Sequence, residues 1–219
     1  RDPEHEFGAN PCCEILLRSS GLCNLTEVVI RPDDTLETLK YKVKMATIMG
    51  TLQSTMTDFR YLRSIWKKNA DEERLLGVSF TGICDHPVMS GSKGEKTLVE
   101  WLESLRKIAR DTNRQWAKKL DINESAAITT VKPSGTVSQL CDTASGIHPR
   151  FSKHYVRTVR QDKKDPLTDF LIAQGVPHED CVMKPESTVV FSFPMASPKT
   201  ALTTADVGSI DQLNLARIY

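Results

Sequence analysis

The sequence predicts an α/β protein built on a parallel sheet. Four short runs of β-branched or apolar residues, near 26–30, 77–83, 126–131 and 188–193, alternate with segments of helical periodicity. Strands that alternate with helices along a chain are typical of βαβ units, which form parallel sheets. A chain of 219 residues is long enough for one domain or a large part of one.

The first strand and helix follow from local patterns. Residues 26–30 are a β-branched run, and 31–34 are expected to turn the chain. Apolar residues then recur every three or four positions over 36–62, which predicts one long amphipathic helix. Asp34 and Glu37 are expected to form its capping box.

The next strand is predicted from a nearly continuous apolar segment, 75–83, which is typical of a strand buried on both faces. The charged and polar residues 66–74 are interpreted as the connection that leads into it. A capping box at Thr97 then predicts a helix that ends near Leu120. Residues 126–131 are expected to form the following strand.

The C-terminal part continues the alternation. The basic stretch 150–164 is interpreted as a solvated face, because it contains few aromatic residues. Residues 166–174 predict a short helix ended by Gly175. A strand over 187–193 and a final helix over 209–219 complete the predicted elements.

Composition describes an ordinary globular protein. The hydrophobic fraction is 39%, the charged fraction is 26% and the formal net charge is +1, which gives no support for a nucleic-acid partner. No run approaches the roughly 18–20 apolar residues of a membrane span, and nothing in the sequence resembles a signal peptide. The six cysteines show no C-x-x-C spacing and are too sparse for a disulfide scaffold. Reduced thiols, a cytoplasmic location and no membrane partner are therefore expected. Cys84, Asp85 and His86 are adjacent but lack distant partners, so no metal site is predicted.

The first chemical signal lies near the N-terminus, in the string Asn-Pro-Cys-Cys-Glu-Ile at 10–15. On an extended backbone, residues two apart point to the same side, so Asn10, Cys12 and Glu14 would converge on one small ligand. Cys23 follows Cys12 by eleven positions, and a loop can bring the two thiols together. A small buried hydrophobe is the more common role of a single cysteine, so spacing alone leaves both roles open.

The second signal is the string Lys-Pro-Ser-Gly-Thr-Val-Ser at 132–138. A strand, a Pro/Gly/Ser turn and a helix start bring free N–H groups and the positive end of a helix together, which favours an anion. The Walker pattern is absent. Taken alone, such a string is more often a simple strand–helix turn.

Together these strings resemble ribonucleotide reductases. The pattern N-P-C-x-E-I followed by G-L-C-N-L is similar to the active-site finger loop of that family, although Cys13 stands at a spacer position that is often glycine. Residues 133–138 match the family's P-[ST]-G-[ST]-x-S loop, and 144–149 follow its S-S-G-I-x-P string with Ala144 in the first place. Residues 74–85 match a barrel-strand pattern, R-x-x-G-V-x-x-T-G-x-x-D.

The resemblance implies a role for each site residue. Cys12 would carry the transient thiyl radical that abstracts the 3′-hydrogen of the ribose, and Glu14 would act as general base on the 3′-hydroxyl. Asn10 would hydrogen-bond the ribose hydroxyls. Cys23 would be the later member of the cysteine pair that delivers two electrons and ends as a disulfide, with its partner in a segment outside this chain. No role is assigned to Cys13.

The resemblance also implies where the substrate phosphates bind and what the fold is. The loop residues expected to bind phosphates are Pro133, Ser134, Gly135, Thr136, Val137 and Ser138. The expected fold is the second half of a ten-stranded α/β barrel with the finger loop at its N-terminus. Residues 1–7 are interpreted as a cloning remnant, and 8–219 as a partial catalytic barrel domain truncated at both ends. Because a half-barrel exposes strand edges and an apolar interior, we expect it to be marginally stable, to pair with another copy or to be disordered near Cys12.

Two features point to one branch of the family. Glu14 disfavours the glycyl-radical enzymes, and the short spacing from Cys12 to Cys23 resembles the adenosylcobalamin-dependent enzymes that reduce ribonucleoside triphosphates. The implied cofactor is adenosylcobalamin, bound by the full enzyme rather than by this fragment, and the implied reductant is thioredoxin or another dithiol. The fragment alone is expected to be inactive. The alternatives are the large subunit of a di-metal-dependent diphosphate reductase and a catalytically silent nucleotide-binding fragment.

Overall fold

The computed structural model describes residues 4–219, which form two compact units. The first unit contains the chain up to Arg150 together with Thr200–Tyr219, and the second contains Phe151–Lys199. Of the predicted cloning remnant, residues 1–3 lie outside the described residues. Its last residue, Phe7, opens strand β1 (Phe7–Ala9), which pairs antiparallel with β2 (Leu16–Arg18).

A parallel sheet forms the centre of the first unit. Strand β3 (Asn24–Val29) pairs in parallel with β4 (Leu76–Thr81), in a register that joins Asn24 to Leu76 and Val29 to Thr81. The predicted parallel pairing of these two runs is confirmed. The third run, 126–131, lies along the other side of β4 but is reduced to one parallel bridge, between Val78 and Thr129.

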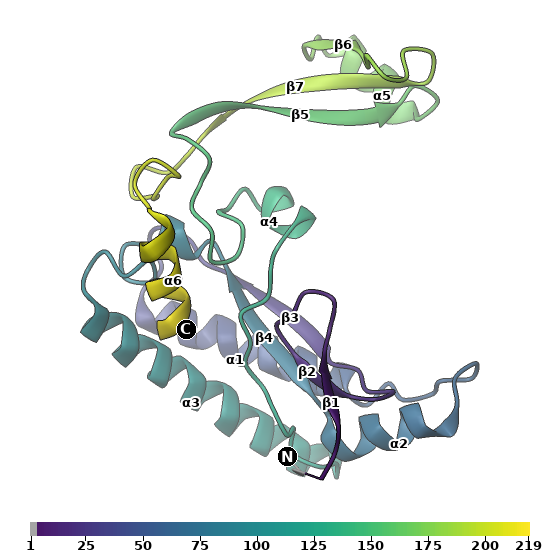
Figure 1. The fold of residues 1–219 in the computed structure, drawn as a ribbon, viewed down its shortest axis with the longest axis vertical. Helices are drawn as coiled ribbons and strands as arrows, with labels where there is room; N and C mark the ends of the chain where they lie inside the picture. The colour runs from purple at the N-terminus through teal and green to yellow at the C-terminus, as the bar shows by residue number, and fades with distance from the viewer. Residues whose placement is uncertain (1–3) are drawn as a thin grey trace. The chain divides into compact units, whose positions relative to one another are not determined.

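Helices cover the sheet and enclose the core. Helix α1 (Leu36–Gln53) packs against β3, β4 and α3 (Glu95–Leu120), and Figure 1 shows the two helices side by side. Smaller helices are α2 (Ser64–Glu73), η1 (Ile83–Asp85), α4 (Thr136–Leu140) and α6 (Ser209–Ile218). The buried core joins residues of the sheet and of α1, α3 and α6, among them Val28, Ile30, Leu39, Val43, Val78, Leu98, Leu105, Ala109 and Leu215.

The prediction of one helix over 36–62 is wrong at its C-terminal end. The helix stops at Gln53, where the hydroxyls of Ser54 and Thr55 donate to the carbonyls of Thr51 and Leu52. Such local side-chain bonds compete with helical backbone bonding. The capping box also differs, because Thr35 and Thr38 form it in place of Asp34 and Glu37.

Two further helical predictions need correction. Residues 66–74, interpreted as a connection, lie largely within α2. Lys67, Lys68 and Glu72 of this helix are exposed, while Asn69, Ala70 and Glu73 are buried. Helix α3 ends at Leu120 as predicted but begins at Glu95 after Gly94, without a side-chain cap, so the capping box at Thr97 is wrong.

The second unit is an antiparallel sheet with one helix. Strands β5 (His154–Asp162), β6 (His178–Asp180) and β7 (Thr188–Ala196) are ordered β5-β7-β6, and α5 (Pro166–Ala173) follows β5. Placing 188–193 in the parallel sheet is therefore wrong. The basic stretch taken as a solvated face is largely β5, in which exposed and half-buried residues alternate as a one-sided strand requires. Within residues 4–219 no helix has the length and apolar character to cross a membrane.

Candidate functional site

The finger loop is a tight turn between β1 and β2. The Asn10 N–H donates to the Ile15 carbonyl at 3.0 Å, and the Cys13 N–H donates to the Asn10 carbonyl at 2.9 Å. Asn10 Oδ1 accepts from the Ile15 N–H at 3.2 Å, so this side chain closes the loop. The condition of an extended backbone is not met here, because Cys13 has a left-handed φ of 61°. Proline after asparagine favours such a turn.

The hairpin that carries the loop is anchored on α2. Arg18 at the end of β2 forms ion pairs with Glu72 at 2.7 Å and Glu73 at 3.2 Å. Asn69 donates to the carbonyl of Ser19 at 2.9 Å. The helix that the sequence did not predict thus supports the predicted active-site loop.

Lys132 brings the two predicted reactive side chains together. Its Nζ lies 3.3 Å from Glu14 Oε1 and 3.7 Å from Cys12 Sγ. Cys12 and Glu14 therefore share one neighbour although their backbone is not extended. Lys132 was not among the predicted site residues, and its position directly before the Pro-Ser-Gly turn was the one available signal.

The carboxylate of Glu14 is held in its charged form. Its side chain is only 3% exposed. Burial by itself raises the pKa of Glu14, but the nearby donors of its own backbone, Asn10 and Lys132, and the charge of Lys132, lower that pKa below the ordinary carboxyl value. Burial by itself lowers the pKa of Lys132, whereas Glu14 and Cys12 raise it above the ordinary value. At neutral pH the two form an ammonium–carboxylate pair.

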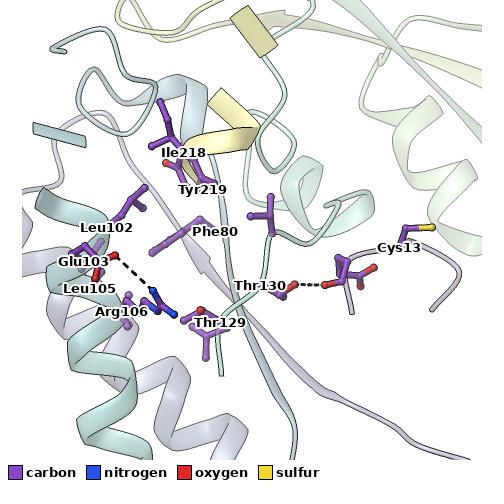
Figure 2. A pocket seen from close by; sticks show the side chains of 14 residues that line it. Cys13, Phe80, Leu102, Glu103, Leu105, Arg106, Thr129, Thr130, Ile218 and Tyr219 are labelled. Carbon is purple, nitrogen blue, oxygen red and sulfur yellow. Dashed lines mark hydrogen bonds and ion pairs between the residues drawn. The ribbon is translucent and has the colours of Figure 1, made fainter. Parts of the chain in front are cut away.

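The same segment also fixes the backbone of the loop. The Thr130 hydroxyl donates to the Glu14 carbonyl at 2.8 Å, and Figure 2 shows Thr130 pointing toward the loop that carries Cys13. Thr130 and Lys132 are two positions apart, so an extended backbone turns both side chains to one side. The incomplete third strand therefore supplies both contacts.

Cys23 lies close to this support. A Cβ placed on Gly77 would lie 3.1 Å from Thr130 Cγ2 and 3.4 Å from Cys23 Sγ, so the absent side chain lets both approach β4. No disulfide joins the six cysteines, all of which lie in the described part of the chain. The structure thus places Cys23 beside the residue that holds Glu14.

Residues 133–137 of the predicted phosphate loop line a cavity of about 560 Å³, together with Lys132, Glu27 and Ser79. Ser134 is 8% exposed, and its Oγ has no hydrogen-bond partner among residues 4–219. Ser138 is fully buried and donates to the Gly135 carbonyl at 2.7 Å, so it shapes the loop.

Helix α4, which follows the loop, has only five residues. It therefore supplies a small dipole, and the predicted contribution of a helix end is weaker than expected. Lys132, which lines this cavity, contributes one whole positive charge to it.

A set of buried contacts, here called the clamp, supports the phosphate loop; it consists of Thr81, Asp85, Ala144, Ser145 and Arg150. Ser145 Oγ donates to the Ser134 carbonyl, and the Thr81 hydroxyl donates to the Ala144 carbonyl at 3.0 Å. Arg150 contacts both oxygens of Asp85 at 2.9 Å, and Asp85 also accepts from the Ala144 N–H. The string at 144–149 thus lies against the phosphate loop and is fixed to the end of β4.

Cys84 and His86, the residues on either side of Asp85 in the sequence, also have structural roles. His86 accepts the Val88 and Met89 N–H groups at Nδ1 and contacts the Asp34 carbonyl through Nε2 at 2.8 Å. Burial raises the pKa of Cys84 to about 12, with the charge of Asp85 adding to the effect.

A cavity of about 600 Å³ opens on the other side of Glu14. Cys13 and Glu14 line one end, and Figure 2 shows Phe80, Leu102, Arg106 and Tyr219 around the rest. Glu14 thus lines one cavity and Lys132 the other, and both volumes lie within the usual range of small-molecule sites.

The fold is that of a ribonucleotide reductase. A crystal structure of a B-12 dependent (class II) ribonucleotide reductase superposes with a TM-score of 0.81 and 23% identity, over 98% of this chain and 33% of that chain. At that identity the match establishes an α/β fold of this type. No family model matches the chain.

Sequence relatives then specify the branch that the chain resembles. It is 33% identical over 211 residues to the adenosylcobalamin-dependent ribonucleoside-triphosphate reductase of Euglena gracilis, which covers 96% of this chain. The Lactobacillus acidophilus enzyme of the same name is 29% identical over 86% of the chain, and the probable one of Dictyostelium discoideum is 30% identical over 96%. The chain spans 27–28% of the length of these relatives. The resemblance stated from the motifs is confirmed.

Proposed function

We propose that this chain is the active-site segment of an adenosylcobalamin-dependent ribonucleoside-triphosphate reductase. Such an enzyme converts ribonucleoside triphosphates to 2′-deoxyribonucleoside triphosphates. The observation that carries the proposal is that Lys132 Nζ lies 3.3 Å from Glu14 and 3.7 Å from Cys12, between two cavities. The relatives of this name, which align over most of the chain, support the same assignment.

The roles of the loop side chains follow from their chemistry. Cys12, as a thiyl radical, takes the 3′-hydrogen of the ribose, because an S–H bond is comparable in strength to that C–H bond. Glu14 takes the proton of the 3′-hydroxyl, and its lowered pKa keeps it in the required ionised form at neutral pH. Asn10 donates through its amide nitrogen to a ribose hydroxyl, since its Oδ1 is occupied by Ile15.

Two thiols supply the electrons. The 2′-hydroxyl leaves as water, the sugar gains two electrons, and Cys23 with a second cysteine from outside this chain becomes a disulfide. Thioredoxin or another dithiol then reduces that disulfide. The position of Cys23 beside Gly77 and Thr130, against the support of the finger loop, favours this role.

The substrate phosphates are assigned to the loop Pro133–Ser138. Ser134 offers a buried hydroxyl that has no partner among the described residues, and Lys132 offers a positive charge on the same cavity. Gly135, Thr136 and Val137 are exposed and line it, and Ser138 keeps the turn closed. A triphosphate bound there would extend its ribose toward Cys12.

The finer architecture and its consequences are part of the proposal. Residues 8–219 would be part of the catalytic domain and form the second half of a ten-stranded barrel, with the finger loop inside. Strand β3 pairs only with β4 in the described chain, so its other edge is open to a further strand or a second copy. We therefore expect the isolated chain to self-associate. Separately, we assign the longer enzyme to the cytoplasm.

Adenosylcobalamin would supply the radical that Cys12 needs. The two cavities at the site are assigned to the substrate, so no residue of this chain is assigned to hold the corrinoid. The isolated chain is accordingly expected to show no turnover.

The test uses the complete reading frame that contains this sequence. The protein and its Cys12→Ser variant are incubated with CTP, adenosylcobalamin and a dithiol, and dCTP is quantified. Product from the unaltered protein alone is the expected result. Product from both would overturn the role of Cys12. Activity that appears only with CDP and a radical-donor subunit would overturn the cobalamin assignment.

A further inference from the structure

Lys132 takes part both in the finger-loop site and in the phosphate-loop cavity. Its ammonium contacts Glu14 at 3.3 Å and Cys12 at 3.7 Å, and the same side chain lines the cavity of the predicted phosphate loop. Glu14 lines the other cavity. The lysine is therefore the direct link between the place where phosphates are expected and the pair that is expected to react.

We propose that Lys132 is a positioning residue through which an anion bound at 133–137 controls the basicity of Glu14. The ammonium contacts Glu14 and Cys12 in this structure. A polyphosphate in the cavity presents several negative oxygens to the same ammonium and draws it toward the loop. The proposal rests on the proposed function, because it makes substrate phosphate the signal that prepares the base.

The direction of the effect follows from electrostatics. An opposite charge within hydrogen-bond distance favours the charged carboxylate, and shared or lost contact with Lys132 makes Glu14 a stronger base. The negative phosphate acts in the same direction on a buried carboxylate. Glu14 would thus be a weak base in the empty site and a better one when a triphosphate is bound.

Other charged groups near the pair do not connect the two cavities. Cys12 and Cys13 belong to the loop itself, and Glu27 on β3 shares the phosphate cavity with Lys132. Glu103 and Arg106 on α3 line the cavity on the Glu14 side, where they pair with each other at 3.7 Å. Lys132 is the residue among 4–219 that contacts Glu14 and lines the phosphate cavity.

The experiment follows the Glu14 carboxyl carbon by NMR during a pH titration of the 219-residue chain. Glutamate is labelled with ¹³C at the side-chain carboxyl, and Glu14→Gln assigns the resonance. Titrations are run with and without inorganic tripolyphosphate, whose affinity is measured by calorimetry. Lys132→Met, Lys132→Arg and the exposed control Lys118→Met are treated in the same way, after circular dichroism confirms their fold.

Tripolyphosphate is expected to move the Glu14 midpoint to higher pH in the unaltered chain, in Lys118→Met and in Lys132→Arg. In Lys132→Met, the Glu14 midpoint is expected to be higher from the start and to lose most of the shift caused by tripolyphosphate. This variant should also bind tripolyphosphate about tenfold more weakly, because one charge-assisted contact is lost. A full shift in Lys132→Met, an unmoved midpoint despite bound anion, or no binding would each overturn the proposal.

The outcome is independent of turnover. Coupling between tripolyphosphate and Glu14 without dCTP formation by the complete protein would leave this inference standing and remove the proposed function. Turnover without coupling would do the reverse. In the complete protein, a Lys132→Met variant should show the acid limb of its kcat/KM profile for CTP, which reports the free enzyme, displaced to higher pH. A lysine with only a structural role would leave that limb in place.

Discussion

Arg150 and Asp85 form an ion pair behind the phosphate loop, with side chains only 4% and 1% exposed. Removing one partner of such a pair leaves a buried charge without compensation. Arg150→Met should therefore destabilise the chain by about 3–5 kcal/mol. The exposed pair of Arg114 and Asp111 provides the control, because Arg114→Gln should cost no more than about 1 kcal/mol.

Urea unfolding followed by circular dichroism measures both variants. A loss below about 1 kcal/mol for Arg150→Met would show that water or a shift of the loop relieves the stranded carboxylate, in conflict with the clamp. The clamp thus gives Arg150, at the edge of the basic stretch and outside the predicted site, a structural role: it binds Asp85, which in turn binds the Ala144 N–H.

Gly82 gives a second prediction about a single residue. Its φ is +83°, and a Cβ built there would lie 2.5 Å from the Ile30 carbonyl oxygen and 3.3 Å from Thr143. Gly82→Ala combines left-handed strain with a clash against backbone and should cost more than about 2 kcal/mol. Gly8→Ala, which meets no atom within 4 Å, should stay within about 1 kcal/mol of the unaltered chain in the same urea experiment. Equal stability of both variants would contradict the tight junction of β3 and β4.

At the scale of elements, the start of α1 depends on pH through Asp34. Burial raises the pKa of Asp34, but bonds from Lys42, the Arg31 N–H and Thr38 outweigh it and lower that pKa below its ordinary value. A carboxyl whose pKa is lowered on folding adds stability above its unfolded value, near 3.8, and loses it as the pH falls through the folded value.

The advantage of the unaltered chain over Asp34→Asn should therefore be largest above about pH 5 and shrink steadily in acid. Thermal unfolding between pH 3 and 7 measures it. Thr35→Ala, which removes the actual cap, should instead cost about 1 kcal/mol at every pH in that range. A difference for Asp34→Asn that does not change with pH would rule out the carboxylate as the source.

Elements and site differ in how far sequence alone could predict them. The strand at 75–83 and the end of α3 were predictable because continuous apolar runs and helical periodicity are local signals. The strand at 154–162 was missed because its basic residues masked the alternation of exposure. Cys12 and Glu14 stood out as a short string, whereas Lys132 meets Cys12 across 120 positions and becomes visible only when the third segment of the sheet is placed.

At the scale of the whole molecule, the chain leaves and re-enters the first unit at hydrogen-bonded positions. The Arg150 N–H donates to the Leu202 carbonyl at 2.9 Å, and the Thr204 N–H donates to the Arg150 carbonyl at 2.8 Å. Residues 151–199 form their own unit with an antiparallel sheet and a capped helix. A short linker can therefore span the exit and entry points without strain.

Replacing 151–199 by a short Gly/Ser linker should leave the first unit folded. Its core residues all lie in 28–147 or 202–219, so the burial that stabilises it is retained. The deleted chain should unfold cooperatively in urea, with a slope reduced in line with its smaller surface, and keep the Lys132-dependent titration of Glu14. A scrambled linker of equal length is the matched control. Loss of cooperative unfolding would mean that the first unit depends on 151–199 for stability, whereas a folded first unit without the titration would mean that the second unit helps to place the phosphate loop.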